Sequence, residues 1–155
     1  MRLFCGIERL ALNVNDIDVS ISFYEKIGLE LIEKDVTGNG KKRAVMRIGM
    51  QFLEFYETAS QKVSHDSVPV NFFGHLSVQV ENLRHTIESW LKKGLLIKRG
   101  SDVSSELVNM DNYNPIIGAD CCVILWTVDP DGNPIEAMEQ QNSLQQSWEK
   151  EHPFS

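Results

Sequence analysis

Four side chains that can take part in binding or catalysis occupy matched positions in two similar halves of the chain. Arg9 and His75 begin the segments RLALNVNDI and HLSVQVENL, which align at an offset of 66 residues (75 − 9). Glu54 and Glu136 each lie between apolar neighbours in the later segments FLEF and PIEA. One histidine with two carboxylates suits a divalent metal ion such as Zn, Ni, Mn or Fe. Arginine has no lone pair for a metal, because it stays protonated.

The first segment of each half alternates apolar and polar residues, which predicts a half-buried strand. The polar side of these strands carries Arg9, Ala11 and Asn13 in the first half and His75, Ser77 and Gln79 in the second. Apolar residues at helical spacing then follow over 17–27 and 83–91. Asp16 and Asn82 are suitable N-caps of these helices, and Gly28 and Gly94 lie where a left-handed residue ends a helix.

Three strands are expected after each helix, near 29–35, 42–49 and 51–57 and then near 95–100, 121–128 and 133–139. Each half is therefore a β-α-β-β-β module, of about residues 7–58 and 73–139. A linker over 59–72 and a polar tail over 140–155 complete a single domain. Neither module can bury its sheet alone, so we expect an α+β fold with one cupped mixed sheet and the helices outside. The polar sides of the strands would line a cleft where the four side chains meet, and the insertion at 101–118 is a candidate lid.

Composition narrows the class of protein. The chain has 155 residues, of which 42% are hydrophobic and 24% charged, as in globular domains. Its net charge of −7 disfavours nucleic acid or an anionic membrane as partner. No apolar run approaches the roughly 20 residues of a membrane span. The three cysteines form no CxxC pattern, so we expect reduced thiols and a cytoplasmic protein.

The chain resembles the vicinal-oxygen-chelate superfamily, which includes glyoxalase I, bleomycin-resistance proteins and extradiol dioxygenases. The most specific elements of the resemblance are the turn DPDGN (129–133) followed by Ile135-Glu136, and GHLSV (74–78) at the start of the second half. The resemblance implies a homodimer and metal ligands on the first and last strand of each module. His75, Glu54 and Glu136 match three of these ligand positions. Arg9 stands at the fourth, where metal-binding relatives commonly have histidine.

Two functions follow from this pattern. The first is a divalent-metal enzyme, an isomerase, lyase or epimerase acting on a small oxygen-rich or carbonyl substrate, with Glu54 or Glu136 as catalytic base. The second is a metal-free small-molecule binding or resistance protein of the bleomycin-resistance type. Arg9 would then pair with a glutamate or attract an anionic ligand group. In either case the expected substrate-binding residues are Arg9, Asn13, Ser77, Phe52 and Tyr56. Glu57 and Glu139, the next carboxylates along the same two segments, are expected to be solvated.

Overall fold

The computed structural model describes residues 9–58, 74–101, 104–117 and 122–139. The predicted linker and tail, 59–72 and 140–155, lie outside the described residues. The chain divides into two compact units, and each is described by itself. The first unit contains residues 1–72 and the turn 129–132, and the second contains residues 73–128 and 133–155. Neither described helix has the length and apolar character needed to cross a membrane.

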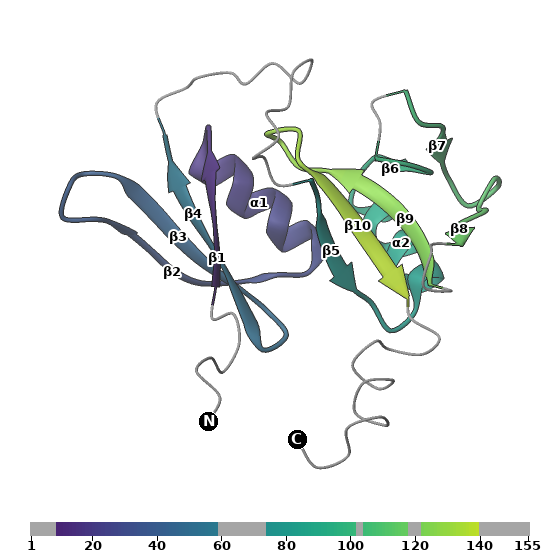
Figure 1. The fold of residues 1–155 in the computed structure, drawn as a ribbon, viewed down its shortest axis with the longest axis horizontal. Helices are drawn as coiled ribbons and strands as arrows, with labels where there is room; N and C mark the ends of the chain where they lie inside the picture. Colours follow the sequence, from purple (N-terminus) through teal and green to yellow (C-terminus); the bar gives the residue numbers. More distant parts are fainter. Residues whose placement is uncertain (1–8, 59–73, 102–103, 118–121, 140–155) are drawn as a thin grey trace, which may run out of the picture. The chain divides into compact units, whose positions relative to one another are not determined.

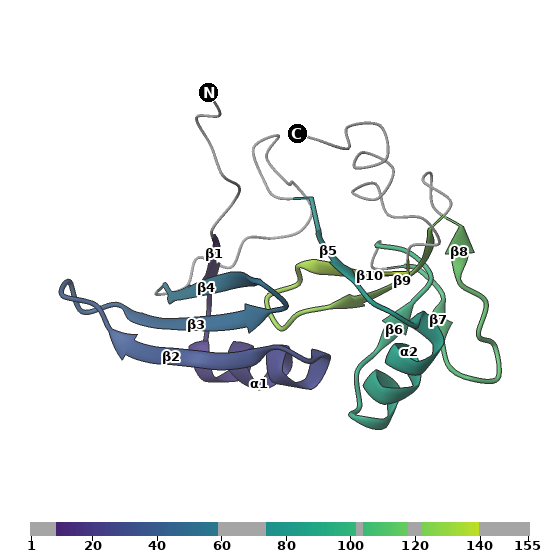
Figure 2. The same ribbon diagram turned by 90° about the horizontal axis from the view of Figure 1, so that it is seen from below.

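The first unit is a four-stranded sheet with one helix against it (Figures 1 and 2). Its elements are β1 (Arg9–Val14), α1 (Ile17–Ile27), β2 (Glu30–Val36), β3 (Lys42–Ile48) and β4 (Gln51–Glu57), with strand order β1-β4-β3-β2. The Asp16 side chain caps α1, as predicted, by accepting hydrogen bonds from the backbone N–H groups of Asp18 and Val19. The helix ends at Gly28, whose φ of +113° is a conformation that favours glycine.

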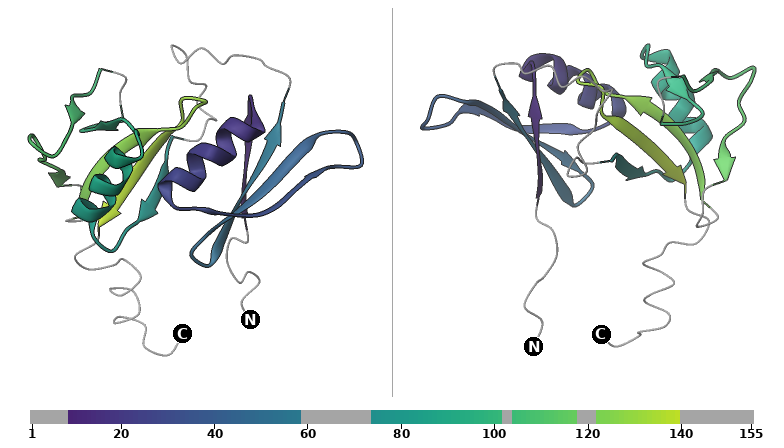
Figure 3. Two further views of the ribbon diagram at one scale, coloured as in Figure 1. Left: turned by 180° about the vertical axis from the view of Figure 1, so that it is seen from behind. Right: turned by 45° about the horizontal axis from the view of Figure 1, so that its top comes forward.

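The second unit repeats this plan with shorter strands (Figure 3). Its elements are β5 (Leu76–Gln79), α2 (Leu83–Lys92), β6 (Ile97–Lys98), β7 (Leu107–Val108), β8 (Ile116–Ile117), β9 (Val123–Val128) and β10 (Pro134–Glu139). The strand order is β5-β10-β9-β6-β7, and β8 pairs with β9. In the described ranges the strands are hydrogen-bonded in two sheets, one per unit, whereas a single sheet was expected. Strands β1 and β5 lie at the ends of these orders, so among the described strands each pairs only with the last strand of its own unit.

Strand registers match the alignment of the two halves. Strands β1 and β4 are parallel, with Ala11 opposite Glu54, and β5 and β10 are parallel, with Ser77 opposite Glu136. The buried sides also correspond, because Phe55 and Ile135, one position from those glutamates, are completely buried. The predicted duplication of a β-α-β-β-β module is therefore confirmed.

Glu57 and Glu139 occupy a second pair of matched positions, and the prediction that both are solvated is wrong. Glu57 Oε2 accepts a hydrogen bond from the backbone N–H of Ile17 at 3.1 Å. Glu139 Oε2 accepts one from the backbone N–H of Leu83 at 2.7 Å. Each carboxylate thus satisfies a free N–H at the start of its unit's helix, where the helix dipole favours negative charge.

The insertion over 101–118 is built into the second unit in its described part. Strand β7 pairs with β6 and β8 pairs with β9, so both extend the sheet. The guanidinium carbon of Arg84 on α2 lies over the Tyr113 ring, 5.1 Å from the centroid of that ring. This contact places the segment around Tyr113 beside the helix, and the described part of the insertion is not a separate lid.

The turn between β9 and β10 groups with the first unit, although both strands belong to the second. The buried Tyr24 hydroxyl donates to Asp129 Oδ2 at 2.9 Å. Asp131 Oδ1 accepts hydrogen bonds from the backbone and side-chain N–H groups of Asn15. The two aspartates of the DPDGN motif therefore bind different parts of this region, Asp129 the Tyr24 hydroxyl within α1 and Asp131 the residue Asn15 just before the helix.

Candidate functional site

The side of the first sheet that faces away from α1 is its polar face. The alternation of the strands and their registers place Ala11 beside Glu54, Asn13 beside Tyr56, and Arg43 of β3 on the other side of Tyr56. The polar face so defined carries Arg9, Asn13, Arg43, Phe52, Glu54 and Tyr56. The opposite side carries the fully buried Ala44, Met46 and Phe55, so the two faces of the sheet differ in burial and polarity.

Glu54 is a buried carboxylate with two guanidinium partners. Its residue is only 7% exposed, and its Oε1 accepts hydrogen bonds from Arg43 Nη1 at 3.0 Å and Arg9 Nη1 at 3.3 Å. Burial alone raises the pKa of Glu54, but the hydrogen bonds with Arg43 and Tyr56 and the charge of Arg9 outweigh it. The pKa therefore lies below its ordinary value, and Glu54 is an ionised acceptor rather than a proton donor at neutral pH.

Arg43 holds this arrangement in place. Its Nε and Nη2 donate to the two carboxylate oxygens of Asp35 at 3.0 and 2.6 Å, and Nη2 also lies 2.8 Å from Glu33. These bonds, together with the one to Glu54, raise the pKa of Arg43 further above its already high value. We call Arg9, Arg43, Glu33, Asp35 and Glu54 the arginine cluster. Sequence analysis missed Arg43, although the alternation of KRAVMRI already puts it on the side opposite Ala44 and Met46.

The second unit surrounds the matched glutamate with different partners. Glu136 is 9% exposed, and its Oε2 accepts a short hydrogen bond from the Ser77 hydroxyl. His75 Nε2 lies 3.9 Å from the same oxygen, and the His75 ring meets the Trp126 ring edge-on, with centroids 5.0 Å apart. A group of His75, Ser77 and Glu136 is thus present within the second unit. It joins an imidazole, a hydroxyl and a carboxylate on one side of the sheet.

The donor sets of the two units fit a metal ion poorly. In the first unit, Glu54 Oε1 is occupied by two cationic donors, and Arg9 has no lone pair to offer. In the second unit, His75 and Glu136 supply two ligands, whereas catalytic zinc sites use three protein ligands. Among the described residues no group of three or more His, Cys, Asp or Glu is arranged to hold a metal. The shared site of His75, Glu54 and Glu136 draws on both units and stays a prediction.

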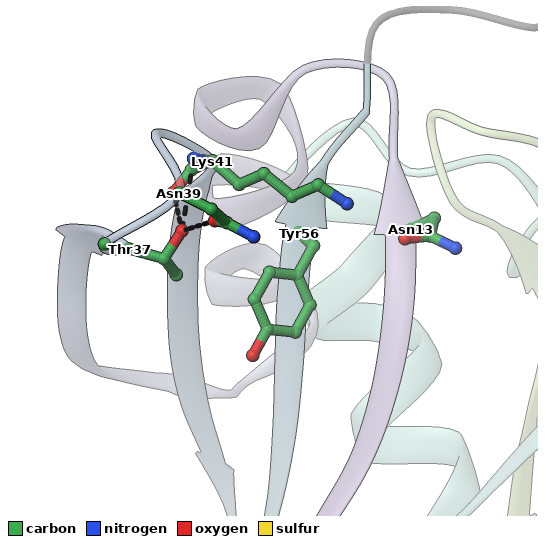
Figure 4. A pocket seen from close by; sticks show the side chains of 6 residues that line it. Asn13, Thr37, Asn39, Lys41 and Tyr56 are labelled. Carbon is green, nitrogen blue, oxygen red and sulfur yellow. Dashed lines mark hydrogen bonds between the residues drawn. The ribbon is translucent and has the colours of Figure 1, made fainter.

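A polar groove of about 540 Å³ lies at the end of the first sheet (Figure 4). Its walls are Asn13 of β1, Tyr56 of β4 and, from the turn between β2 and β3, Thr37, Gly38, Asn39 and Lys41. Asn13 and Tyr56 were predicted to bind substrate, and they meet here, whereas Arg9 and Phe52 lie further along the same strands. Sequence analysis did not predict that the turn between β2 and β3 approaches Asn13 and Tyr56.

Comparison with known proteins agrees with this duplicated fold. The family model for the Glyoxalase/Bleomycin resistance protein/Dioxygenase superfamily matches residues 6–137. The chain belongs to this superfamily. Members of the glyoxalase superfamily often bind divalent metals, whereas Glu54 of this chain accepts hydrogen bonds from two arginines. No curated protein matches the sequence.

Solved structures of the glyoxalase superfamily share the fold at low sequence identity. A glyoxalase family protein from Enterococcus faecalis is 20% identical, with a TM-score of 0.68 over 89% of this chain and 100% of that one. A bleomycin resistance determinant encoded on the transposon Tn5 is 17% identical, with a TM-score of 0.58 over 88% of this chain and 98% of that one. A bleomycin-binding protein complexed with bleomycin is 16% identical, with a TM-score of 0.57 over 89% of this chain and 100% of that one.

Proposed function

We propose that this chain is a small-molecule-binding protein of the bleomycin-resistance type, which holds its ligand on polar side chains and without a metal ion at Glu54. The observation that carries the proposal is the pair of hydrogen bonds from Arg9 and Arg43 to Glu54 Oε1. A guanidinium is a permanent cation, so it takes the place that a metal ion would have beside this carboxylate. The resemblance to a bleomycin-binding protein agrees with this function.

The polar face has the features of a ligand site. Small-molecule sites combine apolar or aromatic contact area with a few oriented polar groups. Here Phe52 and Tyr56 supply rings that are partly exposed, and Asn13 supplies an amide that can both donate and accept. The arginine cluster lies beside them and fixes the conformation of the strand from which two of these side chains project.

A metal-dependent isomerase, lyase or epimerase is the second candidate. The observation that favours it is the pair formed by His75 and Glu136, whose Nε2 and Oε2 atoms lie 3.9 Å apart on the polar side of the second sheet. If a third ligand joined this pair, a bound cation could stabilise an oxyanion next to a substrate carbonyl, and Glu136 could move a proton. The third ligand would be Glu54, as the sequence predicts.

Metal analysis separates the two candidates. The protein, purified without chelator, is incubated with Zn, Ni, Mn or Fe(II) and desalted, and the metal content is measured by mass spectrometry. We expect well below one ion per chain. One ion per chain in the wild type, lost in Glu54→Gln, would contradict the proposed function and support the enzyme.

Ligand binding is tested by thermal stability. A screen of small organic molecules that includes bleomycin is run with the intact chain in the presence of a chelator. A ligand at about 100 times its dissociation constant stabilises the protein by about 2.7 kcal/mol, which corresponds to roughly 5–10 °C for a chain of this size. The predicted homodimer is measured in the same preparation by sedimentation velocity, with and without ligand.

A further inference from the structure

The groove beside Tyr56 differs in charge from the rest of the molecule. The chain carries a net charge of −7, but none of the six residues that line the groove is acidic, and one of them, Lys41, is a cation. A concave site with one sign of charge attracts ligands of the opposite sign. The lining of the groove is therefore suited to an anion, although the chain as a whole carries a net negative charge.

Lys41 is available for such a ligand. Among the described residues its ammonium group makes no ion pair, whereas the neighbouring Lys42 ammonium lies 2.7 Å from Glu57. Figure 4 shows the Lys41 side chain extending from the turn toward Tyr56 and Asn13. Arg9, which the sequence suggested for an anionic group, is instead bound to Glu54. Next to Tyr56, the cation that lines the groove is Lys41.

Thr37 orients a second donor into the groove. Its hydroxyl accepts a hydrogen bond from the Lys41 backbone N–H at 3.1 Å and donates a short one to Asn39 Oδ1. Because the amide oxygen of Asn39 is engaged in this way, its NH₂ group is left to the groove, as Figure 4 shows. The Asn13 amide faces the groove from β1, so an ammonium and two amides surround one space next to the Tyr56 ring.

We propose that this groove binds small organic monocarboxylates, with the carboxylate on Lys41, Asn39 and Asn13 and the body of the ligand against Tyr56. One lysine balances one negative charge, and the two amides can donate to the oxygens without adding charge. The ring of Tyr56 offers a flat apolar surface to a planar ligand. This inference rests on the proposed function and adds to it the chemical class of the ligand.

The probes are benzoate and its uncharged analogue benzamide, titrated into isotope-labelled full-length protein and followed by NMR chemical shifts. We expect benzoate to bind with a dissociation constant of about 1 mM, given its size, and to shift the signals of Asn13, Asn39 and Lys41. Benzamide should bind at least about tenfold more weakly, because a charge-assisted hydrogen bond is lost. Lys41→Gln should weaken benzoate by a similar factor and leave benzamide unchanged.

Lys34→Gln is the matched control. Lys34 belongs to the same unit and pairs with the exposed Asp18, so this variant removes the same charge away from the groove. It should bind benzoate like the wild type. Equal binding of benzoate and benzamide would overturn the anion preference but not the small-molecule function. Benzoate that leaves the groove signals unshifted, or that binds Lys41→Gln undiminished, would overturn the groove assignment. A metal ion held through Glu54 would instead overturn the proposed function.

Discussion

Replacement of Glu54 by glutamine tests the arginine cluster most directly. The substitution keeps the shape of the side chain but removes the charge that Arg9 and Arg43 share. A hydrogen bond to a charged group contributes about 1.5–3 kcal/mol. Arg43 keeps its carboxylate partners on β2, and the Arg9 side chain is 39% exposed and can be rehydrated. We therefore expect a loss of about 2 kcal/mol, below the 3–5 kcal/mol of a fully buried pair.

The loss of stability caused by Glu54→Gln should be largest at neutral pH and smaller in acid. The pKa of Glu54 is lower in the folded protein than its ordinary value, chiefly because the arginines outweigh the effect of burial. A carboxyl group of this kind stabilises the fold above its unfolded pKa, near 4.3, and the stabilisation disappears as pH falls through the folded pKa. The difference in unfolding free energy between wild type and Glu54→Gln should be full at neutral pH and shrink below about pH 4.

Urea unfolding followed by circular dichroism measures this difference, with chelator present throughout. At neutral pH the midpoint of thermal unfolding should also fall by roughly 4–8 °C. Glu136→Gln is the matched control, because Glu136 occupies the same position in the second unit but is bound by Ser77 and His75 instead of arginines. We expect it to lose about 1 kcal/mol. A loss at Glu54 of less than about 0.5 kcal/mol, or one seen only when metal is added, would refute the ion-pair explanation.

Three further substitutions have defined outcomes. Tyr24→Phe should destabilise the fold by about 2 kcal/mol in urea unfolding, because its buried hydroxyl donates to Asp129; an unchanged midpoint would contradict that role. Gly28→Ala should cost about 1 kcal/mol by the same measurement, because φ is +113° there, and a neutral effect would mean that the helix end rearranges. Arg9→His should not create a tight Ni or Zn site, because a second guanidinium remains on Glu54; stoichiometric metal by mass spectrometry would show otherwise.

The duplicated fold was predictable because its evidence is repeated along the sequence. Strand alternation, N-caps and glycine helix ends each occur twice at one offset. An element predicted in one half can therefore be checked against the matching residues of the other half. The structure reproduces this alignment in the parallel pairing of Ala11 with Glu54 and of Ser77 with Glu136. The predicted strand boundaries were less accurate where no matching pattern in the other half supported them. The strand expected near 95–100 covers only Ile97–Lys98.

Only the candidate site residues on the first and last strands of the first unit could be predicted from the sequence. Glu54, Asn13 and Tyr56 lie on the first and last strands, where the repeat defines both the register and the side of the sheet. Arg43 and Lys41 lie on or beside β3, and their positions depend on antiparallel pairing and on the path of a turn. Neither position is marked by a repeated pattern in the sequence, so neither Arg43 nor Lys41 was predicted to lie beside Glu54 and Tyr56.

Comparison of the two units shows which matched positions keep the same partners and which do not. Glu57 and Glu139 have the same task, since each accepts a hydrogen bond from the first backbone N–H of its unit's helix. Glu54 and Glu136 are equally buried yet differ in their partners, because Arg9 and His75 differ at the start of the first strand. Arg9 in place of a histidine, together with Arg43 on β3, gives Glu54 two permanent cations as partners, whereas Glu136 has a potential metal ligand beside it. The strand pairing does not change, so the chemistry of the polar side is altered while the fold that presents it is kept.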